Sequence, residues 1–246
     1  MKDETKLIVD IGNTTAKVAI FKGSLLIDRI ISDNSNHQRL LAFCQQHQPQ
    51  KAIVSSVIAL STELKSALES LAIPVLFLNS ETPLPICNKY KTQTTLGSDR
   101  IAAAVGAYSA FPNRNILVID AGTAITYEFI NERGEYEGGT ISPGIKMRLK
   151  ALHHFTNQLP IVTPEGENPW IGQDTATAIR SGVLHGVELE ISGYMTHFSD
   201  NYSNLLIFLT GGDEIPFDRK FKSCIFADSF LVLKGLNRIL DYNDNL

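Results

Sequence analysis

Apolar and polar positions alternate along the chain in two different ways. Short apolar runs, the first at 7–9, are typical of buried strands, whereas apolar residues three or four positions apart, as in 62–71, are typical of amphipathic helices. Strands and helices follow one another, which predicts an α/β sheet with crossover connections. Strands are predicted at 7–9, 15–20, 24–31, 51–57, 74–78 and 116–119, and helices at 36–46, 62–71, 98–108, 146–155 and around 233–236.

One long stretch, 79–95, does not follow this alternation. It contains Pro83, Pro85, several polar residues and Tyr90. We expect a mostly irregular connection here, and such connections often carry function.

The first predicted strand leads into a polar turn and a second strand, which predicts a β-hairpin with the tip Asp10-Ile11-Gly12-Asn13-Thr14-Thr15-Ala16-Lys17. Such a tip can hold a nucleotide triphosphate, because glycine lets backbone N–H groups approach phosphate oxygens. The two threonines add donors, Lys17 neutralises phosphate charge, and Asp10 can hold a hydrated Mg²⁺. The alternative is an ordinary hairpin with an aspartate at its end.

The pattern of the hairpin recurs in the second half of the chain, where the strand 116–119 is followed by Asp120-Ala121-Gly122-Thr123. Asp10 and Asp120 are 120 − 10 = 110 residues apart, which suggests duplicated halves. We expect these halves at 1–114 and 115–246, with two hairpins facing one ligand in a shared cleft. The arrangement resembles the superfamily of actin, heat-shock chaperone ATPases and sugar kinases. That resemblance implies two α/β domains of the ribonuclease H-like, actin-like ATPase type.

A third polar cluster, Gly97-Ser98-Asp99-Arg100, precedes an alanine-rich run that predicts a helix. Ser98 is a suitable N-cap and Asp99 suits the first turn. Arg100 lies at the positive end of the helix dipole, where a cation is disfavoured unless it meets an anion. Helix capping alone and an anion-binding site are both compatible with this cluster.

The composition limits the class of protein. The chain has 246 residues, 43% of them hydrophobic, and a net charge of −4, so a basic surface for nucleic acid or membrane is not expected. The cysteines are few and widely separated, which predicts neither a disulfide framework nor a metal cluster; they are Cys44, Cys87 and Cys224. We expect a cytoplasmic protein, because the charged start of the sequence lacks a signal-peptide profile and no apolar run is long enough to span a bilayer.

Taken together, the motifs resemble the type III pantothenate kinase family over nearly the whole chain. The three aspartate motifs occur in that family's order and approximate spacing. Further similar segments are Gly138-Gly139-Thr140-Ile141-Ser142-Pro143-Gly144, Asp174-Thr175 with Ser181-Gly182, Leu209-Thr210-Gly211-Gly212 and Leu233-Lys234-Gly235-Leu236.

The resemblance implies roles for the nucleotide and the ions. Residues 10–17 and Thr123 would bind ATP, with Asp10 holding Mg²⁺ beside the phosphates. Asp120 would coordinate the monovalent cation, K⁺ or NH₄⁺, that the family needs.

It also implies the acceptor site. Asp99 would be the base toward the pantothenate hydroxyl, and pantothenate would be bound by Tyr90, Gly97, Ser98, Asp99, Arg100 and Thr175. The Thr175 contact would cross a homodimer interface, and Asp174 takes the place of the asparagine usual in the family.

The implied activity is ATP-dependent phosphorylation of pantothenate to 4'-phosphopantothenate, the first step toward coenzyme A. Two alternatives remain open: another small-molecule kinase of the superfamily, and a non-catalytic nucleotide-binding regulator of the same fold. The presence of Asp10, Asp99 and Asp120 together favours an active enzyme.

Overall fold

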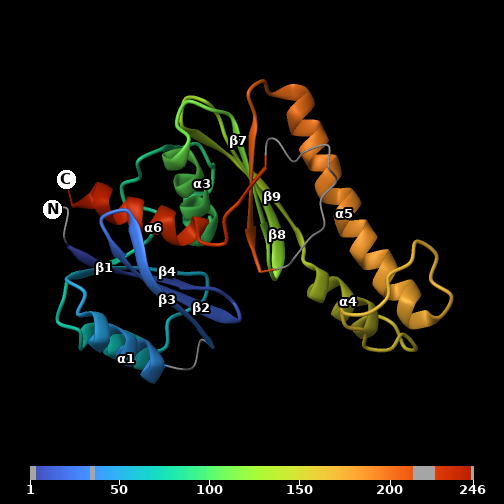
Figure 1. Ribbon diagram of the computed structural model, residues 1–246, viewed down its shortest axis with the longest axis horizontal. Coiled ribbons are helices and arrows are strands. Elements are labelled where there is room, and N and C mark those ends of the chain that lie inside the picture. The colour runs from blue at the N-terminus through green and yellow to red at the C-terminus, as the bar shows by residue number, and fades with distance from the viewer. Residues whose placement is uncertain (1–3, 34–36, 213–224, 245–246) are drawn as a thin grey trace. The chain divides into compact units, whose positions relative to one another are not determined.

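The computed structural model describes residues 4–33, 37–212 and 225–244, so Cys224 lies outside the described residues. The chain forms two compact units (Figure 1). Unit 1 comprises Met1–Asn113, Arg133–Glu137 and Phe230–Leu246, and unit 2 comprises Arg114–Glu132 and Gly138–Ser229. The prediction of domains at 1–114 and 115–246 stays a prediction.

Unit 1 is built on a five-stranded sheet with the strand order β3-β2-β1-β4-β5. β1 pairs antiparallel with β2 and parallel with β4, so the predicted hairpin is present and the next strand returns beside it. The strands are β1 (Thr5–Ile11), β2 (Thr15–Lys22), β3 (Leu25–Asp33), β4 (Lys51–Ser56) and β5 (Val75–Phe77).

Helices pack on this sheet because its strands are apolar on both sides. Leu7 and Val9 belong to a buried cluster with Leu40 of α1 (His37–His47) and Leu64 of α2 (Thr62–Glu69). α3 (Ser98–Ala110) and α6 (Leu231–Asn243) lie side by side and contact strands of the same sheet (Figure 1). The connection expected at 79–95 is irregular apart from β6 (Cys87–Asn88) and a 3₁₀ turn (Gln93–Thr95).

Unit 2 repeats the strand arrangement of unit 1. β7 pairs antiparallel with β8 and parallel with β10, and the strand order β9-β8-β7-β10-β11 matches β3-β2-β1-β4-β5. The repeat confirms a duplicated α/β fold. The strands are β7 (Ile116–Ala121), β8 (Ala124–Ile130), β9 (Glu135–Pro143, whose first residues pair with β6 in unit 1), β10 (Leu206–Gly211) and β11 (Ile225–Ala227).

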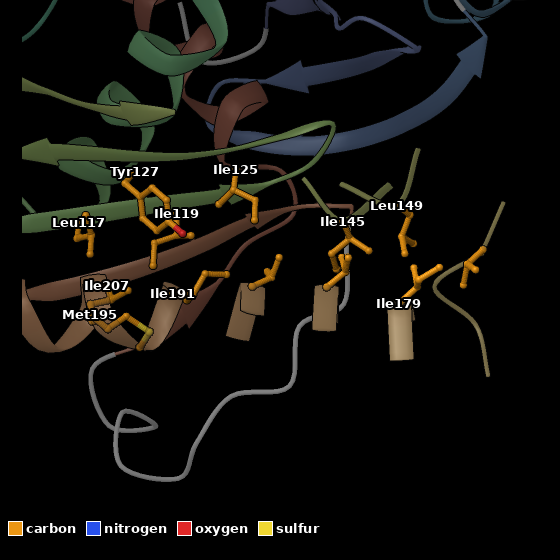
Figure 2. Close-up of a cluster of buried hydrophobic side chains, with 13 residues drawn as sticks. Leu117, Ile119, Ile125, Tyr127, Ile145, Leu149, Ile179, Ile191, Met195 and Ile207 are labelled. Atoms are coloured by element: carbon orange, nitrogen blue, oxygen red, sulfur yellow. The ribbon is translucent and has the colours of Figure 1, made fainter. Parts of the chain in front are cut away.

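Two helices of unit 2, α4 (Ile145–His154) and the 27-residue α5 (Thr175–Asn201), cover the apolar side of its sheet. Figure 2 shows side chains of β7, β8 and β10 meeting those of α4 and α5, with Ile119 and Ile207 near Ile191 and Met195. These four side chains are at most 1% exposed, so burial of apolar surface fixes α5 on the sheet.

Two expectations from composition can be compared with the described residues. Cys44 and Cys87 are free thiols, and burial raises the pKa of Cys44 to about 11, so that thiol is unreactive. None of the described helices is both long enough and apolar enough to cross a membrane.

Candidate active site

The tip of the first hairpin brings Asp10 and Lys17 opposite each other on β1 and β2. Asp10 is buried, whereas the tip residues Asn13, Thr14 and Thr15 are exposed. The Gly12 N–H donates to the carbonyl of Thr15 at 3.0 Å, which closes the turn. The tip therefore exposes hydroxyl groups and backbone beside the facing Asp10 and Lys17. Of the remaining tip residues, Ile11 is buried and Ala16 is half-buried.

A buried serine connects this hairpin to the start of α3. Ser55, at the end of β4, lies beside Asp10 in the strand register. Its Oγ lies 3.2 Å from Asp10 Oδ1 and 2.9 Å from Ser98 Oγ, and the side chain is fully buried. Sequence reasoning missed Ser55, although its place at the end of a buried strand, like that of Asp10, was a usable signal.

The helix α3 begins at Ser98, as predicted, but its N-cap differs from the prediction. Gly97 is the N-cap, and Ser98 is the first helical residue, so the expected capping role of Ser98 is wrong. The reason is that the Ser98 hydroxyl bonds Ser55 and the carbonyl of Ser56 (3.3 Å) instead of its own helix. Asp99 lies in the first turn, as expected, where its Oδ1 accepts the Arg100 N–H at 2.8 Å.

Gly97 leaves room for this carboxylate, because a Cβ at position 97 would lie 2.5 Å from Asp99 Oδ1. Arg100 is buried, and its guanidinium carbon lies 5.5 Å from the centre of the half-buried Tyr90 ring. Unit 1 thus brings Tyr90 and Arg100 together beside Asp99.

A cavity of about 380 Å³ opens beside the same helix start, and all its lining residues belong to unit 1. The lining contains no charged side chain. It consists of Ser56, Val57, Leu78, Asn79, Ser80, Leu84, Asn88, Gln93, Thr94, Thr95, Leu96, Gly97, Ser98 and Ile101. Half of these residues lie in irregular segments, where periodicity carries no signal, and only Gly97 and Ser98 were predicted site residues.

The second hairpin differs from the first in what surrounds its aspartate. The residue opposite Asp120 on β8 is Thr126, at the place where the first hairpin has a lysine. On the other side, Asp120 is in register with Thr210 of β10. Thr210 is 8% exposed, and its Oγ1 has no hydrogen-bond partner in the described part of the chain. Thr123, at the exposed tip, accepts a hydrogen bond from the Gly144 N–H at 3.1 Å.

Thr175 is the first residue of α5 and is exposed. The preceding Asp174 is the N-cap: it accepts the Thr177 N–H at 2.9 Å and forms a capping box with that residue. These hydrogen bonds hold the pKa of Asp174 below its ordinary value. Its carboxylate is therefore engaged with its own helix.

The predicted site residues fall into two groups. Residues 10–17, Tyr90 and 97–100 belong to unit 1, and Asp120, Thr123 and Thr175 belong to unit 2. Within the described ranges, no three His, Cys, Asp or Glu side chains gather as a metal-binding group.

Comparison with known proteins identifies the family. The model of type III pantothenate kinase matches residues 6–197. A type III pantothenate kinase of Bacteroides fragilis is 55% identical, over 97% of this chain and 98% of its own length.

Solved structures agree on the fold. A conserved Campylobacter jejuni protein assigned to the Baf family of transcriptional activators is 27% identical, with a TM-score of 0.62 over 98% of this chain and all of its own. The activator of 2-hydroxyisocaproyl-CoA dehydratase from Clostridium difficile, solved with ADPNP, has a TM-score of 0.56 at 11% identity over 98% of both chains. The family match and the full-length relative together show that this chain belongs to the type III pantothenate kinase family.

Proposed function

We propose that this protein phosphorylates pantothenate with ATP to give 4'-phosphopantothenate, the first step of coenzyme A biosynthesis. The family match and the 55% identical kinase support the activity. The structural observation that carries it is the Ser55 contact, which joins the Asp10 hairpin to Ser98, the first residue of the helix that bears Asp99. Phosphoryl transfer depends mainly on positioning and charge stabilisation, and this contact holds the phosphate-binding and acceptor-binding segments in one unit.

ATP is proposed to bind at residues 10–17, with a further contact from Thr123. The exposed hydroxyl groups and backbone of the tip suit phosphate oxygens, and Lys17 supplies positive charge. Asp10 fits Mg²⁺, which usually takes one or two carboxylates, phosphate oxygens and waters. When bound, the metal ion neutralises charge on the phosphates.

The acceptor is proposed to bind at the start of α3. Asp99, at a helix N-terminus, can orient the attacking hydroxyl and take its proton late in the transfer. Arg100 is suited to the pantothenate carboxylate and Tyr90 packs beside it. The adjoining uncharged cavity offers amide and hydroxyl partners for the rest of such a molecule. Gly97, Ser98 and Thr175 complete the proposed contacts.

Asp120 is proposed to hold a monovalent cation, K⁺ or NH₄⁺. The donor set fits, because oxygen atoms are the ligands of such ions and the buried Thr210 Oγ1 beside Asp120 has no described partner. The ion would screen Asp120 from the triphosphate.

We also propose a homodimer in the cytoplasm. Large apolar side chains of unit 2 are exposed, as expected for a surface that a second copy covers; they include Phe155, Ile161, Trp170, Ile171 and Leu189. Thr175 begins the helix that carries Leu189, so a partner could reach it. Light scattering tests this proposal: twice the 27.1 kDa of one chain is expected, and a fully active monomer would contradict it.

The regulator alternative has one observation in its favour, the naming of the Campylobacter jejuni protein as a transcriptional activator. A coupled assay of ATP consumption over a panel of small hydroxylated acids separates the candidates. We expect consumption with pantothenate well above that with the other acids. Consumption with a different acid indicates another kinase, and none with any acid indicates a regulator.

A further inference from the structure

A polar cluster in unit 2 connects α5, α4, β8 and β9 through one carboxylate, that of Glu190. Its Oε1 accepts the hydroxyl hydrogen of Tyr127 at 2.8 Å. Its Oε2 accepts hydrogen bonds from Ser142 Oγ at 3.1 Å and from Arg148 Nη2 at 2.5 Å. Glu190 therefore ties its helix to three other elements of the same unit.

The cluster reaches the second hairpin by two routes. The first is Tyr127, which is in β8, the second strand of that hairpin, and is paired with Ile119, the residue before Asp120. The Tyr127 ring also stacks on Tyr194, one turn beyond Glu190 on α5, with ring centres 3.9 Å apart. One strand of the hairpin is thus held by Glu190 and its helix.

The second route runs through the corner between β9 and α4. Arg148 Nε donates to the carbonyl of Pro143 at 2.7 Å, which fixes the residue before Gly144. Gly144 in turn donates its N–H to the carbonyl of Thr123 at 3.1 Å. A Cβ at Gly144 would lie 2.2 Å from the Gly122 carbonyl oxygen, so only glycine permits this approach to the hairpin tip.

The charge state of Glu190 suits this role. Burial alone raises its pKa, but the hydrogen bonds from Arg148, Tyr127 and Ser142 outweigh burial and bring the pKa below its ordinary value. The Glu190 and Arg148 side chains are each 23% exposed, so the pair is partly shielded from water. A charged, multiply bonded carboxylate gives directional contacts that the surrounding apolar cluster cannot give.

We propose that Glu190 is a positioning residue for nucleotide binding, which sets the hairpin tip at Thr123 through Tyr127 and through Arg148, Pro143 and Gly144. The inference rests on the proposed function only in taking Thr123 as an ATP contact. The apolar side chains that hold α5 on the sheet, among them Ile191 and Met195, form no hydrogen bonds, so their packing does not depend on the Glu190 charge; Tyr127 belongs both to this apolar set and to the polar cluster. Loss of the Glu190 charge should therefore move the tip while α5 stays in place.

The test is Glu190→Gln, with Glu188→Gln as the matched control on the same helix. Glu188 contacts His185 at 3.5 Å and is outside the cluster. Glu190→Gln removes the charge and leaves one side-chain oxygen atom, in place of two, to accept from Tyr127, Ser142 and Arg148. We expect the dissociation constant of a non-hydrolysable ATP analogue and the KM for ATP to rise about five- to tenfold, as loss of one hydrogen bond does. The KM for pantothenate should change less than twofold.

Four further outcomes are decisive. Unchanged analogue binding with a lowered melting temperature would overturn the proposal, because the role would then be structural only. An equal rise in both KM values, or the same effect in Glu188→Gln, would also overturn it. If Glu190→Gln fails to fold, Tyr127→Phe removes one donor and should raise the analogue dissociation constant by a smaller factor, whereas no rise would overturn the proposal.

The proposed function and this inference fail in different ways. A wild-type protein that binds the analogue but does not phosphorylate pantothenate would refute the function, and the comparison of analogue binding would still decide the role of Glu190. A wild-type protein that does not bind the analogue would refute both.

Discussion

A single hydroxyl group, that of Ser55, joins two polar segments 88 residues apart in the chain, at Asp10 and Ser98. A fully buried hydroxyl needs a partner, because an unmade hydrogen bond costs about 1–3 kcal/mol. Ser55 satisfies this need by contacting the groups around which the proposed chemistry is arranged. At the residue scale, then, the site depends on a buried side chain as well as on exposed ones.

Ser55→Ala should lower turnover about tenfold, which corresponds to about 1.4 kcal/mol, because the Asp10 carboxylate and the start of α3 both lose a fixed neighbour. Steady-state kinetics and thermal unfolding measure the effect. Ser70→Ala is the control: it removes a 2.7 Å hydrogen bond to the Ala67 carbonyl at a helix end in the same unit. Equal loss of turnover in the two variants would contradict a specific role for Ser55.

Asp99→Asn keeps the size of the side chain and removes its charge. We predict that turnover falls at least about a hundredfold, as general-base removal usually does, while ATP binding stays nearly normal. Single-turnover kinetics and nucleotide titration check the two parts. Turnover like that of the wild type would remove Asp99 from the mechanism.

The aspartates, Lys17 and Arg100 could be selected as candidate site residues from the sequence alone, because charged residues beside glycines and at the ends of apolar runs stand out there. It did not reveal Ser55 or the cavity lining, since these depend on which strand lies next to β1 and on the path of an irregular segment. The register that places Ser55 beside Asp10 exists only after the parallel pairing of β1 with β4.

At the scale of elements, the packed helices α3 and α6 carry the segment that is proposed to bind the acceptor. The two helices cross at Gly106 and Gly235: a Cβ at Gly235 would lie 1.8 Å from the Ala102 carbonyl oxygen, and one at Gly106 would lie 2.4 Å from that of Leu231. The alanine-rich face of α3 permits the same close approach. α6 thus helps to fix the position of α3, the helix that bears Asp99.

Gly235→Ala should therefore destabilise unit 1. Overpacking costs about 1–3 kcal/mol, and for a chain of this size each kcal/mol lowers the melting temperature by about 2–4 °C. Gly193→Ala on α5 is the control, because no described atom lies within 4 Å of its added Cβ and alanine favours a helix. A Gly235→Ala variant as stable as the control would contradict the close crossing.

Most element predictions were confirmed to within a few residues, because long apolar patterns determine strands and helices locally. One exception was the cap of α3, where tertiary contacts redirected the Ser98 side chain and left Gly97 as the cap. Another was α5 (Thr175–Asn201), for which no helix had been predicted. The close packing of α3 on α6 could not be predicted either. The sequence shows that both helices contain small residues, but not that these two helices pack against each other.

At the scale of the whole molecule, duplication gives two hairpins with one topology and different chemistry. The first pairs Asp10 with Lys17 and the second pairs Asp120 with Thr126. A lysine suits phosphate, whereas a carboxylate with neutral neighbours suits a cation. The duplicated fold was predictable from the repeated motif. The residue opposite each aspartate, a lysine in one hairpin and a threonine in the other, became known only from the strand register of the structure.

Replacement of K⁺ by Na⁺ should reduce activity at least tenfold, and Asp120→Ala should remove the difference between the two salts. The reason is that Asp120 is proposed to select the ion that screens it from the triphosphate. Initial rates and the melting temperature in matched chloride salts measure the response. Equal rates in both salts for the wild-type protein would contradict the cation proposal.

The most direct measurement of the central claim identifies the product formed by the purified protein from ATP, Mg²⁺, K⁺ and pantothenate. We predict that ³¹P NMR and mass spectrometry detect 4'-phosphopantothenate, formed in equal amount to ADP and not formed when pantothenate is omitted. ATP hydrolysis independent of pantothenate, or no phosphorylated pantothenate under these conditions, would contradict the account.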